Sequence, residues 1–301
     1  MMTLPHVVAI MPTTESRSEF AVLARMYFER QSYPAHLREI VVVDGAGTIG
    51  AKRNKAIAQS PRGAVIIHWD DDDWHHPDRI AVQVQRLLRD PMTLINGMNC
   101  GYFFWPSDRQ VLRYSNSQQI PSGNPYIMGG TFCYHRTWWD RYPFQDKQIG
   151  EDNLFLGTFP RGTVEDLRRE DLYVVIRHNG NTGPLATHNA TLWRPESIEA
   201  VRNIMGNDME NYSNAETYLV RLSHPYRRHR GNEPTPQAGA VIRVSAEELA
   251  HLQSQRHRCD EVLSDVPAKQ VAAEEETPAD ALDDLGATAI ENTKAVSVSV
   301  S

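Results

Sequence analysis

The first ninety residues alternate between short apolar runs and segments whose apolar residues have helical spacing. Residues 6–10, 40–43 and 64–68 are short runs rich in β-branched side chains, which predicts three buried strands. Residues 20–28 place apolar side chains on one face of a helix, and residues 50–59 also have helical composition. This alternation predicts an α/β fold with a mostly parallel central sheet and flanking helices.

Local signals mark the ends of two helices. Ser16 and Glu19 have the spacing of a capping box, which predicts a helix start there, and Pro34 follows as a stop. Pro77 follows the third predicted strand and is well placed as the first residue of a third helix. That helix would carry Ile80 and Val84 on its buried face.

The pattern changes after residue 94. Aromatic segments at residues 101–105 and 111–114 predict two antiparallel strands. A further strand is predicted over residues 172–176, and a helix over residues 195–205 is expected to close the fold. The second half is therefore predicted to be mixed, in contrast to the parallel first half.

We expect one domain followed by an extension. The domain covers residues 1–230, with a parallel half at about 1–100 and a mixed half at about 101–230. In residues 231–301 large apolar side chains become scarce, and about the last thirty residues are predicted to form a disordered acidic tail. One possible helix at residues 245–252 interrupts this extension, because Ser245 and Glu248 have capping-box spacing.

Composition narrows the class of protein. A hydrophobic fraction of 41% and a charged fraction of 23% are typical of a soluble globular chain. The three cysteines are far apart in sequence, which argues against a disulfide framework or a zinc ribbon. There is no leader-like start and no apolar run long enough to span a membrane, so we expect a cytoplasmic protein without a transmembrane segment.

The net charge of the whole chain is a poor guide to its binding partners. The net charge of -7 comes mostly from the acidic tail. A basic cluster at residues 227–230 is predicted to be a solvated turn, with an anion-attracting patch as the alternative.

Four consecutive aspartates, Asp70 to Asp73, directly follow the third predicted strand. Such a cluster of like charges is costly unless a positive group binds to it, and all-oxygen ligands suit Mg²⁺ or Mn²⁺. In open α/β sheets ligands bind beyond the carboxyl ends of the strands, where Asp44 is also expected. The alternative is that the aspartates cap the helix at Pro77, although a cap needs only one of them.

The run I-I-H-W-D-D-D-D-W-H-H-P resembles the DxD signature of family 2 glycosyltransferases, which have the GT-A fold. Other segments resemble motifs of that family in the same order: V-A-I-M-P-T-T, I-V-V-V-D-G, G-A-K-R-N-K-A-I-A, the Gly129-Gly130 pair, G-E-D-N-L-F and His178. The resemblance covers about residues 5–205. It implies a metal-dependent, inverting transfer of a sugar from a nucleoside diphosphate sugar to an acceptor hydroxyl.

The resemblance also implies roles for individual residues. Asp152 would be the base that accepts the proton of the acceptor hydroxyl, with Glu151 beside it. The metal, Mn²⁺ or Mg²⁺, would be held by Asp72, Asp70 and His178. The donor would contact Pro12, Thr13, Glu15, Asp44, Arg53, Asp70 and Asp71. The acceptor side would include Gly129, Gly130 and Trp138.

Bland interpretations stand beside these roles. Glu151 and Asp152 could simply begin a helix, where acidic side chains favour the macrodipole. An isolated histidine such as His178 or His188 is usually a hydrogen-bonded loop residue. Trp138 could stack on a sugar, but an aromatic residue on a short helix more often packs in the core.

Two departures from the family pattern leave the donor open. Thr14 and Glu15 stand where the family has an aromatic residue and an asparagine, and Gly45 stands where it has a second aspartate. UDP is the commonest nucleotide in such enzymes, and GDP and dTDP remain alternatives. The acceptor also stays open among a glycan, a lipid-linked sugar, a protein and a modified nucleic-acid base.

Two other classes of function remain possible from the sequence. A sugar-nucleotide nucleotidyltransferase would share the fold and the acidic metal ligands, but it normally has a glycine-rich loop after the first strand, and residues 11–17 contain no glycine. A non-catalytic module that binds carbohydrate or nucleic acid would not need the aspartates or Asp152.

Overall fold

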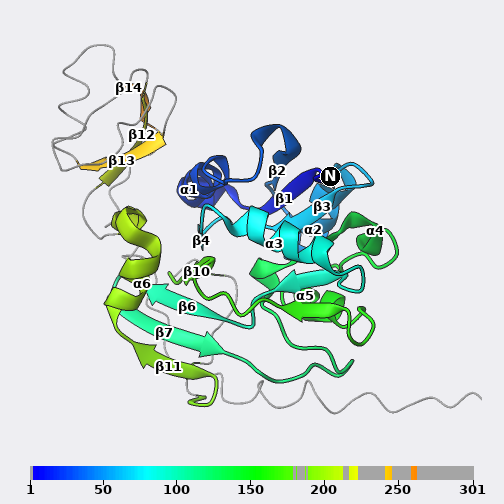
Figure 1. Ribbon diagram of the computed structural model, residues 1–301. Helices are drawn as coiled ribbons and strands as arrows, with labels where there is room; N and C mark the ends of the chain where they lie inside the picture. The colour runs from blue at the N-terminus through cyan, green and yellow to red at the C-terminus, as the bar shows by residue number, and fades with distance from the viewer. Residues whose placement is uncertain are drawn as a thin grey trace, which may run out of the picture.

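The computed structural model describes residues 3–178, 181, 187 and 189–212, together with three strands at 217–222, 241–245 and 259–262 (Figure 1). The strands of these residues form sheets of six, five and three strands.

The six-stranded sheet confirms the predicted α/β architecture. Its order is β2-β1-β3-β8-β5-β9, and the pairs β1–β2, β1–β3 and β5–β9 are parallel, whereas β8 is antiparallel to both neighbours. The three strands predicted in the first ninety residues are therefore neighbours at one side of this sheet. The strands are β1 (Val7–Pro12), β2 (Arg38–Val43), β3 (Val65–His68), β5 (Ile95–Gly97), β8 (Cys133–His135) and β9 (Val164–Asp166).

Helices cover both faces of this sheet. Successive side chains of a strand point to opposite faces, so each inner strand contributes to two cores. Val7, Ala9 and Met11 of β1 pack in one core with α1 and α3, while Val8 and Ile10 pack in a second core with α2 and α5. The helices are α1 (Ser18–Glu29), α2 (Ile49–Ala58), α3 (Arg79–Arg89), α4 (Arg136–Trp139), α5 (Glu151–Leu156) and α6 (Ile198–Met205). Short 3-10 turns lie at η1 (Glu15–Arg17), η2 (Ala35–Leu37), η3 (Gly129–Thr131) and η4 (Gly206–Tyr212).

Two predicted helix starts differ from the observed ones by one or two residues. Helix α1 begins at Ser18, after the turn η1, and Arg17 occupies its N-cap without a capping side chain. The capping-box prediction failed because the chain still forms a 3-10 turn here, from which the Arg17 side chain reaches two aspartates. Helix α3 begins at Arg79, two residues after Pro77.

The five-stranded sheet confirms the predicted mixed second half. Its order is β11-β7-β6-β10-β4; β6 and β7 are antiparallel as predicted, and β10 runs parallel to β6. The predicted helix at 195–205 begins later, at Ile198, because Pro195 lies in an edge strand, which tolerates proline. The strands are β4 (Trp74–His75), β6 (Cys100–Trp105), β7 (Gln110–Ser115), β10 (Tyr173–Ile176) and β11 (Trp193–Glu196).

The three-stranded sheet contains β12 (Thr217–Leu222), β13 (Val241–Ser245) and β14 (Cys259–Val262). Strand β12 pairs antiparallel with both others, so these hydrogen bonds cross the predicted boundary at residue 230. Ser245 ends β13, and the rest of the helix predicted at 245–252 lies outside the described residues, as do the cluster at 227–230, His188 and the acidic tail.

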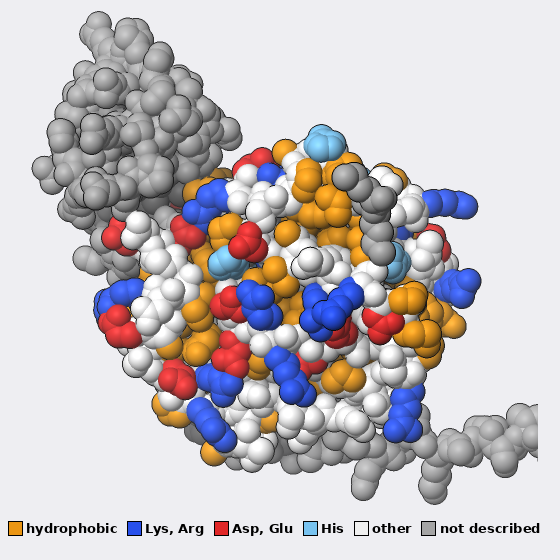
Figure 2. Space-filling view, in the orientation of Figure 1, with side chains coloured by type: hydrophobic (Ala, Val, Ile, Leu, Met, Phe, Trp, Pro, Cys, Tyr) orange, Lys and Arg blue, Asp and Glu red, His pale blue; other side chains and the backbone are white. Residues whose placement is uncertain are grey.

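Surface chemistry and helix length add two facts. The face of the molecule in Figure 2 carries basic and acidic side chains next to one another, with hydrophobic side chains between them. None of the helices in the described part of the chain has the length and apolar composition needed to cross a bilayer.

Candidate functional site

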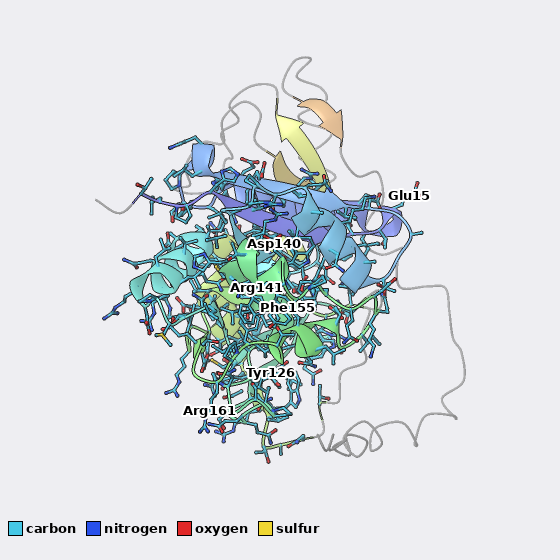
Figure 3. All side chains as sticks on the ribbon, turned by 90° about the vertical axis from the view of Figure 1, so that its right-hand side faces the viewer. Glu15, Tyr126, Asp140, Arg141, Phe155 and Arg161 are labelled. Atoms are coloured by element: carbon cyan, nitrogen blue, oxygen red, sulfur yellow. The ribbon has the colours of Figure 1, made fainter. Side chains whose placement is uncertain are left out.

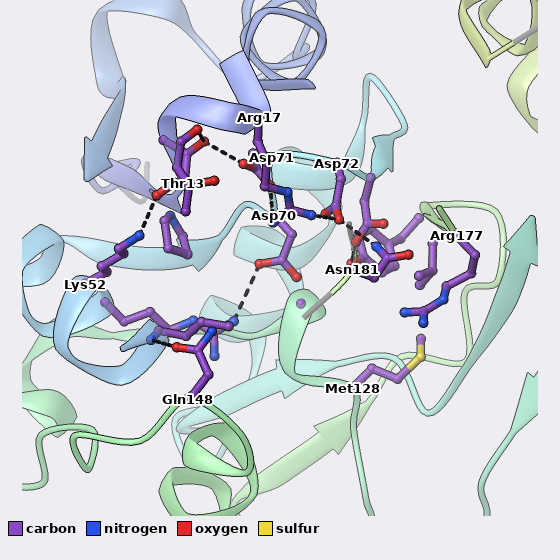
Figure 4. A pocket seen from close by; sticks show the side chains of 18 of the residues that line it. Thr13, Arg17, Lys52, Asp70, Asp71, Asp72, Met128, Gln148, Arg177 and Asn181 are labelled. Atoms are coloured by element: carbon purple, nitrogen blue, oxygen red, sulfur yellow. Dashed lines mark hydrogen bonds and ion pairs between the residues drawn. The ribbon is translucent and has the colours of Figure 1, made fainter. Parts of the chain in front are cut away.

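A cavity of about 600 Å³ opens at the carboxyl ends of β1 and β3, where the two larger sheets meet (Figure 4). The aspartate run leads the chain from one sheet to the other, because β3 precedes it and β4 follows it. The polar wall comes from β1, the following turn, α2 and the aspartates. The opposite wall is mostly aromatic and includes Phe103, Tyr114, Tyr126 and Trp193.

Helix α2 supplies two cations to the polar wall. The Thr48 side chain caps this helix by accepting a hydrogen bond from the Ala51 amide. Gly50 allows close contact with the loop before α5, since a Cβ at this position would lie 2.0 Å from the carbonyl oxygen of Gln145. With the helix held there, Lys52 Nζ donates to the Thr13 carbonyl at 2.6 Å, and Arg53 faces the aspartates.

Asp70 lies at the centre of the cavity. Its Oδ1 is 3.5 Å from an Arg53 guanidinium nitrogen. Burial raises the pKa of Asp70, and the positive charge of Arg53 opposes that rise. Gly130 lies against this carboxylate, since a Cβ there would be 2.5 Å from Asp70 Oδ2. The glycine therefore leaves the space that the Asp70 side chain occupies.

Asp71 binds back to the first strand. Its Oδ2 accepts a hydrogen bond from Thr13 Oγ1 at 2.6 Å, and its Oδ1 is 3.0 Å from an Arg17 nitrogen. Burial and the negative charge of Asp72 raise the pKa of Asp71 to about 7, against the opposing charge of Arg17. The carboxylate thus joins the end of β1 to the aspartate run.

Asp72 receives three nitrogen groups on one oxygen. Arg17 is ion-paired with its Oδ2, Asn181 Nδ2 donates to the same atom at 2.8 Å, and His178 Nε2 lies 3.2 Å away. Although burial raises the pKa of Asp72, the hydrogen bond with His178 and the charge of Arg17 hold it below its ordinary value. The His178 ring also stacks on Phe20, with the ring centroids 4.3 Å apart.

Asp73 has a structural role that the sequence did not indicate. The Tyr173 hydroxyl and the Ile176 backbone amide both donate to its carboxylate, which ties the run to β10. Burial and the charges of Asp72 and Asp70 raise the pKa of Asp73 well above its ordinary value.

Arg79, which is completely buried, holds the floor of the site together. Its guanidinium donates to the carbonyl oxygens of His68 at 2.9 Å and Gly130 at 2.7 Å, and it also contacts Gln83 and His75. These bonds link the end of β3 to the glycine turn η3. Arg79 therefore helps to fix the spacing between the aspartates and the Gly129-Gly130 pair, together with the contact of 2.7 Å between His68 Nδ1 and the Gly129 carbonyl oxygen.

The Glu-Asp motif divides into two different environments. Glu151 is buried, and its Oε1 lies 2.5 Å from an Arg53 nitrogen. Asp152 is partly exposed and packs directly on Gly129, where a Cβ would lie 2.1 Å from Asp152 Oδ2. Burial raises the pKa of Tyr126, a residue of the cavity wall, and the charge of Asp152 raises it further.

The structure brings most of the predicted site residues together. The predicted residues that line the cavity are Pro12, Thr13, Arg53, Asp70, Asp71, Asp72 and Gly130. Four others lie next to that lining: Glu151 contacts Arg53, His178 contacts Asp72, and Gly129, which precedes Gly130 in the chain, is in contact with Asp152.

Three predicted residues are placed elsewhere. Glu15 is exposed on the turn η1, at the periphery of the molecule (Figure 3). Asp44 is exposed, and its carboxylate accepts a hydrogen bond from the Gly45 amide. Trp138 stacks on Phe159, with centroids 4.8 Å apart, and donates to Thr158. Trp138 is partly buried, and its ring packs against the second core and is not among the residues that line the cavity.

Several cavity residues have no prediction from the sequence. Arg17, Lys52, Tyr173, Arg177 and Asn181 all line it. Lys52 directly precedes the predicted Arg53, and the K-R pair was the available signal. Arg17 was not considered because residues 16–19 were interpreted as a capping box. Tyr173, Arg177 and Asn181 reach the site through the pairing of β10 with β6, which the sequence does not indicate.

The carboxylate oxygens of Asp70 and Asp72 are suitable ligands for a hard divalent ion, since Mg²⁺ and Mn²⁺ favour oxygen ligands. Within the part of the chain that the structure describes, no three acidic, histidine or cysteine side chains converge on one point. An ion held here would therefore depend on one or two carboxylates together with oxygen atoms of a bound ligand.

Sequence comparisons identify no relative: no family model matches the chain, and no curated protein matches it significantly. Among solved structures, it is similar to TarS of S. aureus in complex with UDP-GlcNAc, at a TM-score of 0.47 and 15% identity, covering 60% of this chain and 62% of that chain. TarS in complex with UDP gives a TM-score of 0.46 at 16% identity, covering 57% of this chain and 60% of that chain. The mannosyltransferase PcManGT from Pyrobaculum calidifontis, in complex with GDP-Man and Mn²⁺, gives a TM-score of 0.38 at 17% identity, covering 58% of this chain and 57% of that chain. The chain spans about three fifths of the length of each of these structures.

Proposed function

We propose that the chain is a GT-A glycosyltransferase of family 2, which transfers a sugar from a nucleoside diphosphate sugar to an acceptor hydroxyl. The observation that carries this proposal is a single cavity with two unlike walls. One wall combines carboxylates with Lys52 and Arg53, and the other presents aromatic side chains. The first wall suits the charged part of the donor, and the rings of the second wall would offer a surface on which a sugar can stack.

The polar wall suits the donor. Pro12 and Thr13 end β1 at the position where an open α/β sheet binds a nucleotide. Lys52 and Arg53 would offset the negative charge of the diphosphate. We retain UDP as the first candidate nucleotide, with GDP and dTDP as alternatives.

Asp70 and Asp72 would hold the divalent ion, Mn²⁺ or Mg²⁺, with His178 beside Asp72 as a third ligand or as its positioning partner. Such an ion, when bound, neutralises charge that develops on the departing nucleoside diphosphate. Arg53 lies 3.5 Å from Asp70 and would add a fixed positive charge on the same side.

Asp152 is the better candidate for the base of the two predicted catalytic residues. Glu151 is committed to its ion pair with Arg53, whereas Asp152 is partly exposed. Asp152 would take the proton of the acceptor hydroxyl as that oxygen bonds to the anomeric carbon and the bond from that carbon to the diphosphate oxygen breaks. A single displacement of this kind inverts the configuration at the anomeric carbon.

A thermal-shift screen tests the donor site. UDP, GDP, dTDP and their common sugar conjugates would each be added with Mn²⁺, Mg²⁺ or EDTA. A ligand at about 100 times its Kd stabilises a protein by about 2.7 kcal/mol, which is a shift of about 5 to 10 °C for a chain of this size. We expect one nucleotide to give such a shift only when metal is present. If no nucleotide shifts the melting temperature, the proposal is wrong.

The variant Asp152→Asn tests the base. It should bind the donor like the unmodified protein and lose transfer by about 10²-fold to 10⁴-fold, because the amide cannot accept the proton. Asp140→Asn, which removes an exposed carboxylate directly after α4, is the matched control. Transfer by Asp152→Asn at the rate of this control would mean that the base lies elsewhere.

A further inference from the structure

Arg17 lies directly between two of the aspartates (Figure 4). One guanidinium nitrogen is 3.0 Å from Asp71 Oδ1, and the other pairs with Asp72 Oδ2. Only 17% of the Arg17 side chain is exposed, so water screens these ion pairs weakly. The carboxylate expected to bind a divalent ion therefore already has a positive partner from its own chain.

The geometry at Asp72 sharpens this conflict. Arg17, His178 and Asn181 all contact the same oxygen, Oδ2. A divalent ion at that atom must displace the guanidinium. An ion that used only the other oxygen would still lie next to a fixed positive charge. Either way, Arg17 lowers the affinity of the empty cavity for a cation.

Two other cations of the cavity, Arg53 and Lys52, have different partners. Arg53 is paired with Glu151 at 2.5 Å and reaches Asp70 only at 3.5 Å. Lys52 donates to the backbone carbonyl of Thr13. Arg17 is thus placed differently from both, because it contacts two carboxylates of the run at once.

We propose that Arg17 is the resident counter-ion of Asp71 and Asp72 and that it competes with the divalent ion for Asp72. A second step rests on the proposed function: once the ion has displaced the Arg17 guanidinium from Asp72, that guanidinium pairs with the diphosphate of the donor. Arg17 would therefore oppose metal binding in the empty cavity and favour donor binding in the loaded one. Metal and donor would bind more tightly together than separately.

Calorimetric titration of Mn²⁺ into the donor-free protein tests the first part. Arg17→Met keeps most of the side-chain length and removes the charge, so we expect Mn²⁺ to bind about tenfold more tightly or better. Arg17→Lys keeps the charge and should remain within a few-fold of the unmodified protein. Lys52→Met removes a charge from the same wall but no carboxylate contact, so its effect should be clearly smaller.

Two results would overturn this part: Mn²⁺ affinity that is unchanged or weaker in Arg17→Met, or an equal gain in Lys52→Met. A merely structural role for Arg17 predicts weaker binding, since a loosened site loses its ligands. Circular dichroism and the melting temperature would show that each variant is folded.

Titration of UDP in saturating Mn²⁺ tests the second part. Arg17→Met should bind UDP about tenfold more weakly, so that one substitution has opposite effects on the two ligands. Equal UDP affinity in the variant and the unmodified protein would refute the released-guanidinium step. If the unmodified protein binds none of the nucleotides, the proposed function fails, while the Mn²⁺ result still decides the role of Arg17 as counter-ion.

Discussion

Replacing Gly129 with alanine gives a direct test of the base assignment, because the glycine and Asp152 share one small space. A Cβ at position 129 would lie 2.1 Å from Asp152 Oδ2 and 2.7 Å from Asp152 Cβ. An ordinary contact between such atoms is about 3.5 Å. The Asp152 side chain must therefore move by more than about 1 Å. The close approach to Cβ means that the start of α5 must also shift.

The size of the expected loss follows from this displacement. A misplacement of about 1 Å in a reacting group can cost about 10²-fold in rate. We therefore expect Gly129→Ala to lower kcat about 10²-fold. UDP affinity should fall much less than kcat, because Gly129 is not part of the cavity lining and Asp152 has no assigned role in donor binding. A loss of a few-fold is expected, since a shift at the start of α5 reaches Glu151 and its ion pair with Arg53.

The neighbouring glycine provides the contrast. A Cβ at Gly130 would lie 2.5 Å from Asp70 Oδ2 and 2.3 Å from the Tyr173 hydroxyl. Gly130→Ala should therefore weaken the binding of donor and metal. Gly63→Ala is the control, since no atom lies within 4 Å of the added Cβ.

The assay measures transfer under saturating donor, together with UDP affinity by calorimetry for all three variants. A Gly129→Ala protein that keeps full kcat would refute the placement of Asp152 at the reacting hydroxyl. Equal losses of UDP affinity in Gly129→Ala and Gly130→Ala would show that the two glycines support one site and do not separate base from donor.

Two further predictions concern buried groups. Arg79→Met should lower stability by about 2 to 6 kcal/mol, because it leaves the carbonyl oxygens of His68 and Gly130 without this donor, at about 1 to 3 kcal/mol for each buried acceptor. The melting temperature should therefore fall by roughly 4 to 24 °C. A change below 2 °C would contradict the structural role. Burial raises the pKa of both Cys100 and Cys133 to about 12, so each thiolate should be about 10³-fold scarcer than at the ordinary pKa of 9.0, and alkylation of the native protein followed by mass spectrometry should leave both unmodified.

Much of the fold could be predicted because the first strands and helices have strong local signals. The run at residues 64–68 and the helical spacing at residues 20–28 each correspond to a single element, β3 and α1. Errors arose where tertiary contacts decided the outcome. Pro195 lies in an edge strand because Trp193–Glu196 pairs with β7, a partner about eighty residues earlier in the chain. No local pattern contains that pairing.

The site was only partly predictable for a related reason. The aspartates are contiguous, so their common location was visible in the sequence. Their partners are not contiguous with them: Arg17 precedes Asp72 by 55 residues and Asn181 follows it by 109. Whether Trp138 faces the cavity or the core also depends on the position of Phe159, which is fixed only in the folded chain.

The four aspartates are best understood through the directions in which they point. The run crosses from β3 in one sheet to β4 in the other, and its members bind different elements. Asp71 binds the end of β1 through Thr13, and Asp73 binds β10 through Tyr173 and Ile176. These two carboxylates tie the run to a strand of each sheet, and Asp71 also lies 3.0 Å from an Arg17 nitrogen. All four line the cavity, but the Asp70 and Asp72 side chains pair with Arg53 and Arg17 and do not carry the bonds to β1 and β10 that hold Asp71 and Asp73. Because their main partners are cations that a ligand could displace or share, Asp70 and Asp72 are the members of the run best placed to respond to a metal or a diphosphate.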